Sequence, residues 1–163
     1  MGRSVELTVS EWLKARGWYV IPSYDYSGND RDKAPRLQGI ADAFPVPDLD
    51  TGKAGERRWV EVKAKDSASF THKTGRYEHG IEHYDDYVKV AEITGTSAWL
   101  AIVETTTVRE SRSRWGERGR LWVQSFEKLG PPRRSGILGK RMAYWPVDSG
   151  LFYQFWVDLD LEA

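Results

Sequence analysis

Residues 57–66 read RRWVEVKAKD, and their alternation of apolar and charged side chains constrains the fold more than any other stretch. The stretch contains one tryptophan and two valines, which favour a β-strand. Because side chains alternate between the two faces of a strand, Glu61, Lys63 and Lys65 must share one face. A solvated face would carry such charges for solubility, whereas a catalytic strand would carry them for chemistry.

Two segments carry apolar side chains at the spacing of an amphipathic helix. The first stripe spans residues 5–13 and is followed by Gly17; the second spans residues 81–91 and is followed by Gly95. Glycine is the usual residue just after the last turn of a helix, so both helices are expected to end there. Besides 57–65, short apolar runs predict strands at residues 18–21, 98–104, 121–129, 141–145 and 151–159, with a turn into a helix as the alternative within 121–129. This mixture of helices and strands indicates the α/β class.

The segments between these elements are expected to be loops or short, irregular strands. Residues 22–39 and 66–80 are polar and rich in turn-forming side chains, so both are predicted as loops. Residues 40–50 contain two prolines, which limit any strand there to a short, bulged or edge strand. The turn that leads into the charged strand is expected at Thr51–Gly55.

The composition of the 163 residues restricts the cellular setting and the kinds of metal site. The chain contains no cysteine, so any bound metal must be held by oxygen or imidazole. It lacks an apolar run of about 18 residues, so no membrane-spanning helix is expected. The first residues do not resemble the apolar part of a signal peptide. We therefore expect a single, cytoplasmic domain.

Basic side chains are concentrated in one part of a chain whose net charge is zero. Between residues 105 and 145 there are ten basic and three acidic side chains, which gives this part a net charge of +7 and the remainder −7. The asymmetry indicates an acidic, cation-binding part beside a phosphate-binding part, although a solvated Arg-rich loop has the same composition. The ten basic residues are Arg109, Arg112, Arg114, Arg118, Arg120, Lys128, Arg133, Arg134, Lys140 and Arg141.

The sequence contains Pro47-Asp48 and, thirteen residues after the aspartate, Glu61-Val62-Lys63. Through these residues the chain resembles the PD-(D/E)XK nuclease superfamily, whose restriction-endonuclease-like fold includes archaeal Holliday-junction resolvases. The resemblance covers about residues 3–104 and implies a mixed central β-sheet flanked by helices, in the order α-β-β-β-α-β. Residues 105–163 are then expected to form an Arg-rich loop and β-rich C-terminal additions to a single nuclease-like domain.

The resemblance also implies a metal-dependent reaction. Hydrolysis of a phosphodiester needs an activated water and relief of charge on the phosphate, and Mg²⁺ or Mn²⁺ held by carboxylate oxygens supplies both. Asp48 and Glu61 are the expected ligands, and the resemblance implies the backbone carbonyl of Val62 as a further one. Lys63, on the strand face that carries Glu61, would position or deprotonate the attacking water, or hold the phosphate.

Two residues, Asp48 and Asp42, are candidates for the aspartate of the motif. A symmetric hairpin centred near residues 51–52 would place Asp42, rather than Asp48, opposite Glu61. We prefer Asp48 because it carries the Pro-Asp pair and because prolines shorten the preceding strand. Asp42 stays open as the alternative metal ligand.

A glutamate on the first helix completes the site in many superfamily members. A helical wheel places Glu6 on the flank of the apolar stripe and Glu11 toward solvent. Glu6 is therefore the candidate for a supporting catalytic role. The alternative interpretation is an ordinary acid favoured by the dipole of the first helical turn.

Further residues are expected to contact nucleic acid. Lys65 continues the charged face of the strand beyond Lys63. His83 and Tyr87, four residues apart, resemble a Gln-x-x-x-Tyr motif that follows the E-x-K strand in some superfamily members, with histidine in place of glutamine. The alternative interpretation of this pair is a core tyrosine and a surface histidine. From the Arg-rich region, the candidates for phosphate contacts are Arg112, Arg114 and Arg118.

These patterns predict a Mg²⁺- or Mn²⁺-dependent endonuclease that hydrolyses DNA, duplex or branched, in repair, recombination or defence. Superfamily nucleases are often homodimers, so a homodimer is expected by analogy. The alternative is a non-catalytic nucleic-acid-binding or complex-forming module that retains the fold. Clustered carboxylates favour catalysis, because on a surface that only binds DNA they would repel the phosphates.

Overall fold

Six strands form a central sheet in the order β1-β4-β5-β7-β8-β11. The fold is that of a computed structural model, which describes residues 2–22, 35–66, 78–105, 118–137, 139–147 and 149–159. β5 and β7 are parallel and the other neighbouring pairs are antiparallel, so the sheet is mixed. The strands are β1 (Tyr19–Pro22), β4 (Leu49–Lys53), β5 (Glu56–Asp66), β7 (Ser97–Thr105), β8 (Arg118–Ser125) and β11 (Tyr153–Asp158).

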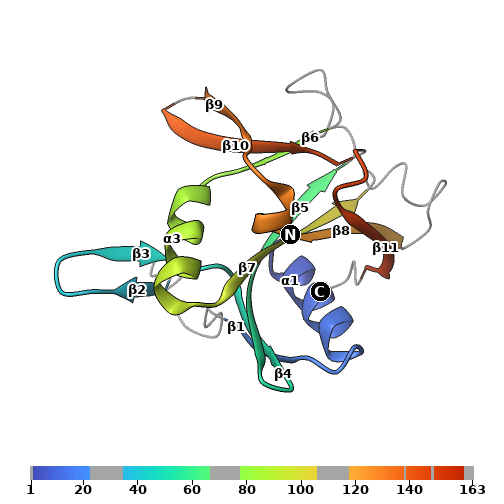
Figure 1. Ribbon diagram of the computed structural model, residues 1–163. Helices are drawn as coiled ribbons and strands as arrows, with labels where there is room; N and C mark the ends of the chain where they lie inside the picture. The colour runs from blue at the N-terminus through green and yellow to red at the C-terminus, as the bar shows by residue number, and fades with distance from the viewer. Residues whose placement is uncertain are drawn as a thin grey trace.

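Two helices cover opposite faces of this sheet (Figure 1). α1 (Gly2–Lys14) precedes β1, and α3 (Tyr84–Thr94) lies between β5 and β7 along the chain. The main elements therefore follow the order α1-β1-β4-β5-α3-β7. Gly17 and Gly95, which follow the two helices, adopt the left-handed backbone with φ of 86° and 62°. The predicted α/β class, with a mixed sheet flanked by helices in the order α-β-β-β-α-β, is confirmed.

The alternating side chains of β5 separate two apolar clusters, one on each face of the sheet. Val60 and Val62 pack with the apolar stripe of α1. Trp59 belongs to the other cluster, which contains the buried Tyr87 of α3. Because strand side chains alternate, Glu61 points toward the α3 face and away from α1.

The turn between β4 and β5 is tighter and later in the chain than the expected turn at Thr51–Gly55. β4 continues through residues 51–53, and only Ala54 and Gly55 form the turn. Both turn residues have positive φ, 49° and 82°, which is the backbone of a two-residue hairpin turn. The position of the turn determines the register of the hairpin, and therefore which aspartate lies beside Glu61.

Short strands also form in the two segments predicted as loops. β2 lies within residues 22–39 and pairs with β3, and β6 overlaps residues 66–80 and pairs with β10. Each is stabilised by its partner strand and not by an apolar pattern of its own, so the loop prediction is wrong over these residues. β9, which the sequence did not indicate, completes a second sheet in the order β6-β10-β9. The bounds are β2 (Arg36–Gln38), β3 (Ala43–Pro45), β6 (Glu78–Ile81), β9 (Arg133–Ile137) and β10 (Lys140–Pro146).

The C-terminal part of the chain is β-rich, as predicted, and it extends the central sheet. β8 pairs with β7, and β11 pairs with β8 at the sheet edge. A short helix, α5 (Phe126–Leu129), follows β8, so the strand predicted at 121–129 ends at residue 125 and its last four residues are helical. None of the helices in the described ranges has the length and apolar character that crossing a membrane requires.

Candidate active site

The register of the β4–β5 hairpin brings two acidic residues together. Leu49 pairs with Val60, so Asp48 lies beside Glu61, one position beyond the last pair of the ladder. Oδ2 of Asp48 accepts a hydrogen bond from the backbone N–H of Val62 at 2.8 Å. Asp48 is 9% exposed and Glu61 is 1% exposed, so both acids are buried.

Asp42 lies in the turn between β2 and β3. Its side chain is exposed, and its backbone carbonyl accepts a hydrogen bond from the N–H of Gly39 at 2.7 Å. The hairpin that would have placed Asp42 opposite Glu61 does not form, because the β4–β5 turn falls at residues 54–55. The structure thus brings Asp48, and not Asp42, next to Glu61.

Burial dominates the electrostatics of the two acids. It raises the pKa of Glu61 to about 8; the nearby Asp48 adds to this rise, while the Lys63 ammonium and the Tyr87 hydroxyl lower the pKa. Burial also raises the pKa of Asp48, against the opposing effects of the Val62 N–H and of Lys63. Burial disfavours the charged forms of these two adjacent carboxyl groups, and a bound cation would offset that charge.

Lys63 connects the buried acids to the surface. Its Nζ forms an ion pair with Oε1 of Glu61. The Lys63 side chain is 34% exposed, so it lies between the buried carboxyl group and solvent. The second oxygen, Oε2 of Glu61, is buried and has no hydrogen-bond partner among the described residues. A buried polar atom left in this way costs free energy that a bound cation would recover.

The backbone of Val62 contributes to the same place. The N–H and C=O groups of one strand residue lie on the same edge of the strand. Because the Val62 N–H bonds to Asp48, the Val62 carbonyl also lies on the Asp48 edge of β5. Asp48, Glu61 and Val62 therefore offer oxygen donors, which Mg²⁺ and Mn²⁺ prefer.

Glu6 lies on α1, whose apolar residues pack on the sheet face opposite to the side chain of Glu61. Within the described ranges, no group of three Asp, Glu, His or Cys side chains is arranged to hold a metal. The supporting role of Glu6 stays a prediction.

Tyr87 and His83 differ in burial. Tyr87 is 5% exposed and lies in the core on the Glu61 face of the sheet. His83 is exposed and directly precedes α3, where its Nδ1 lies 3.2 Å from Oδ2 of Asp86. Their ring centroids are 6.3 Å apart. The tyrosine thus contacts the acid site from the core, and the histidine lies at the surface above it.

The other predicted nucleic-acid contacts are only partly described. Lys65 is half-buried and continues the Glu61 face of β5. The backbone of Arg118 begins β8, but its side chain lies outside the described part of the structure. Arg112 and Arg114 lie outside the described residues. Contacts of these four residues with DNA stay predictions.

Another buried acid, Glu104, was not singled out from the sequence. It is 0% exposed; Oε1 accepts a hydrogen bond from Arg120 at 3.0 Å and Oε2 accepts one from Nε1 of Trp122 at 2.9 Å. It is the register partner of Lys65 on β7. Because both its oxygens are already bonded within the protein, it differs from Glu61. The alternation within AWLAIVE at 98–104 places it on a buried face and was the available signal.

Comparisons with known proteins leave the family open. No protein-family model matches the chain, and no curated protein sequence matches it. Among solved structures, the fold is similar to that of Hjc, a Holliday junction resolvase from the archaeal hyperthermophile Archaeoglobus fulgidus. The identity is 13% with 86% of each chain covered, and the TM-score is 0.49. These values are too low to assign a family, so the geometry of the site is the basis for its function.

Proposed function

We propose that the chain is a Mg²⁺- or Mn²⁺-dependent endonuclease that hydrolyses DNA phosphodiester bonds. The observation that carries the proposal is the pair of buried carboxyl groups, Asp48 and Glu61, with the Lys63 ammonium on Glu61. A charged sheet face that served solubility alone would be exposed and would not bury two acids side by side. The three residue types are those that metal-dependent phosphodiester hydrolysis requires.

The residues present fit a hard divalent cation. The donors are oxygens, Oε2 of Glu61 has no hydrogen-bond partner among the described residues, and burial raises the pKa of both acids. Asp48, Glu61 and the carbonyl of Val62 would hold the ion. When bound, such an ion stabilises negative charge on the phosphate and lowers the pKa of a water ligand.

The chain's own residues would fix the geometry of the reaction. The Val62 N–H orients the Asp48 carboxylate by its hydrogen bond. The Lys63 ammonium, held by Glu61 but partly exposed, would hold the phosphate or orient the attacking water. Both functions need a cation at the border of a buried anionic site, which is where Lys63 lies.

The proposed substrate is DNA, duplex or branched, and the proposed setting is repair, recombination or defence in the cytoplasm. Contacts with the DNA backbone are proposed for Lys65, His83 and the Arg-rich region. Tyr87 would contribute through Glu61, because it lies in the core. A homodimer would allow two sites to act on two strands.

Lys63→Ala is expected to lower the rate of DNA cleavage by about 100-fold or more, because it removes the ammonium from the site. The measurement is nicking of supercoiled plasmid and of four-way junctions with Mg²⁺ or Mn²⁺, stopped by EDTA. Affinity for the same DNA, measured in EDTA, should change by less than about threefold, since one of many phosphate contacts is lost. Lys89→Ala, which removes an exposed lysine of α3, is the matched control and should cut like the wild type.

The same assay separates the nuclease from the non-catalytic module. A wild-type protein that binds these DNAs but cuts none of them with either metal is the result expected of a binding module. Cleavage that survives in Lys63→Ala at the wild-type rate would place the reaction at another site.

A further inference from the structure

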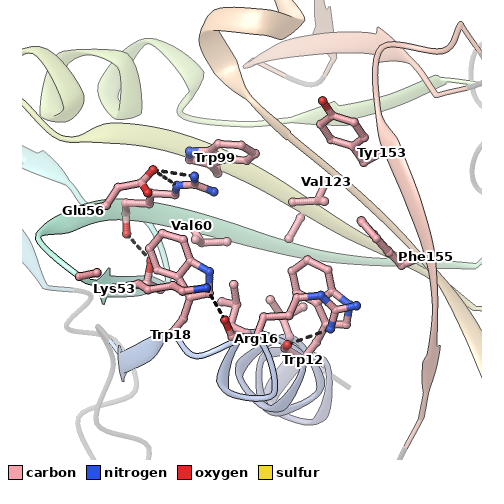
Figure 2. A pocket seen from close by; sticks show the side chains of 16 residues that line it. Trp12, Arg16, Trp18, Lys53, Glu56, Val60, Trp99, Val123, Tyr153 and Phe155 are labelled. Atoms are coloured by element: carbon pink, nitrogen blue, oxygen red, sulfur yellow. Dashed lines mark hydrogen bonds and ion pairs between the residues drawn. The ribbon is translucent and has the colours of Figure 1, made fainter.

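A cavity of about 670 Å³ lies on the α1 face of the sheet, opposite to the face that carries Glu61 (Figure 2). Its floor is apolar and is formed by Val60, Ala101 and Val123 of three adjacent strands. The volume lies within the usual range for small-ligand pockets. The cavity is therefore separate from the candidate active site and large enough for a ligand of its own.

One wall of the cavity is an arginine placed between two indole rings. The Arg58 guanidinium carbon lies 4.6 Å from the ring centroid of Trp18 and 4.1 Å from that of Trp99. Nη2 of Arg58 also lies 2.6 Å from Oε1 of Glu56, which fixes the guanidinium. This wall combines a planar cation with flat aromatic surface.

The facing wall also combines an arginine with aromatic rings. Arg16 lies 4.0 Å from the ring centroid of Trp12 and 5.3 Å from that of Phe155. Figure 2 shows Trp18 and Trp99 on one side of the cavity and Trp12, Phe155 and Tyr153 on the other. Tyr153 is 53% exposed and lies at the rim. A flat ring that enters the cavity would therefore meet aromatic surface on both sides.

The charge of the lining selects an anion. Among the described residues that line the cavity, three are basic (Arg16, Lys53 and Arg58) and one, Glu56, is acidic, which leaves a net charge of +2. Nζ of Lys53 donates to the backbone carbonyl of Arg16 at 2.6 Å and lies 6.0 Å from the ring centroid of Trp18, whereas the Arg16 guanidinium lies over Trp12, so cations lie on both walls. A ligand with an aromatic ring and a negative group satisfies both the walls and the charge.

We propose that this cavity binds an unpaired nucleotide of a DNA strand, with the base between the aromatic walls and the phosphate at the Arg16 guanidinium. Aromatic rings interleaved with basic side chains are the features that hold single strands without reading their sequence. A paired base is excluded, because its faces are covered by stacking within the duplex. The site lies on the face opposite to Glu61 and needs no metal, so its binding does not depend on the proposed cleavage.

The test is binding of a fluorescein-labelled oligothymidylate of about eight nucleotides, followed by anisotropy with the full chain in EDTA. Tyr153→Ala and Arg16→Gln should each weaken binding by about tenfold, the size of one lost stacking or phosphate contact. Tyr153→Trp, which keeps an aromatic ring, should bind like the wild type. Lys89→Gln removes an exposed cation of α3, on the other face of the sheet, and is the matched control for charge.

Three results would overturn the proposal. They are wild-type affinity in both Tyr153→Ala and Arg16→Gln, equal competition by a duplex of the same sequence, and equal competition by thymidine monophosphate at the same concentration. Equal competition by thymidine monophosphate would show that the cavity binds a free nucleotide. Because every arm is measured without metal, failure of DNA cleavage leaves this test unchanged, and loss of binding here leaves the cleavage assay with Lys63→Ala unchanged.

Discussion

Glu61→Gln is expected to abolish metal-dependent DNA cleavage and, at pH 8 without metal, to raise the free energy of unfolding by about 2–4 kcal/mol. Glutamine keeps the shape of the side chain but cannot ionise and cannot neutralise a bound cation. The wild-type carboxyl group lies where burial raises its pKa to about 8. The substitution therefore removes a group that the proposed function needs and that the metal-free fold disfavours in its charged form.

The raised pKa of Glu61 makes the free energy of unfolding of the wild type depend on pH. The unfolded chain releases the Glu61 proton near the ordinary pKa of 4.5, whereas the folded chain keeps it up to about pH 8. Between these values the folded state binds more protons, so the free energy of unfolding of the wild type falls as pH rises. Glu61→Gln lacks this contribution, so its advantage over the wild type should be small at pH 4.5 and grow toward pH 8. Urea unfolding of both proteins in EDTA measures the difference.

Glu82→Gln is the matched control for this prediction, because its pKa is shifted in the opposite direction. A hydrogen bond from Lys140 lowers the pKa of Glu82, so its ionised form contributes stability above the ordinary glutamate pKa. Glu82→Gln should therefore be slightly less stable than the wild type at pH 8. A Glu61→Gln protein that is no more stable than the wild type at pH 8 would show that Glu61 ionises without penalty and is not buried as described.

Asp48→Asn is expected to lower the rate of cleavage by about 100-fold or more, whereas Asp42→Asn should leave it unchanged. The two changes are chemically identical, so they separate the position of the carboxylate from its removal. In the Asp48→Asn protein, the new amide oxygen can still accept the hydrogen bond that the Val62 N–H donates to Asp48 in the wild type. The fold should therefore stay intact, and Mn²⁺ affinity measured by calorimetry should fall together with cleavage.

If Asp42→Asn lost cleavage and Asp48→Asn kept it, the catalytic carboxylate would come from the β2–β3 turn. The β4–β5 register, which pairs Leu49 with Val60, would then not describe the active protein.

Periodicity was sufficient to predict the charged strand and the two helices, whereas the mixed sheet was what the family resemblance implied. The charged face of residues 57–66 follows from a period of two, and the two helix ends follow from glycines that adopt a left-handed backbone. β2 and β6 were missed because they are three and four residues long and are stabilised by pairing with β3 and β10, a pairing that their own sequences do not indicate. Propensity alone cannot show such pairing.

The sequence indicated the residues of the candidate site, but it did not show how they are arranged in space. The hairpin turn was placed too early because Ala54, a residue without a strong turn preference, adopts a positive φ of 49°. The burial of Glu61 depends on Tyr87 and the α3 face, which are brought to it only by tertiary packing. A helical wheel showed that Glu6 flanks the apolar stripe, but it could not show which face of the sheet α1 covers.

Anomalous diffraction from crystals soaked in Mn²⁺ shows directly whether the two buried acids hold a metal. One anomalous peak is expected, bonded to carboxylate oxygens of both Asp48 and Glu61, with the carbonyl of Val62 as a further ligand and Lys63 at its border. A soak at saturating Mn²⁺ that leaves these two carboxyl groups without a peak, in crystals of a wild-type protein that cuts DNA, would contradict this expectation.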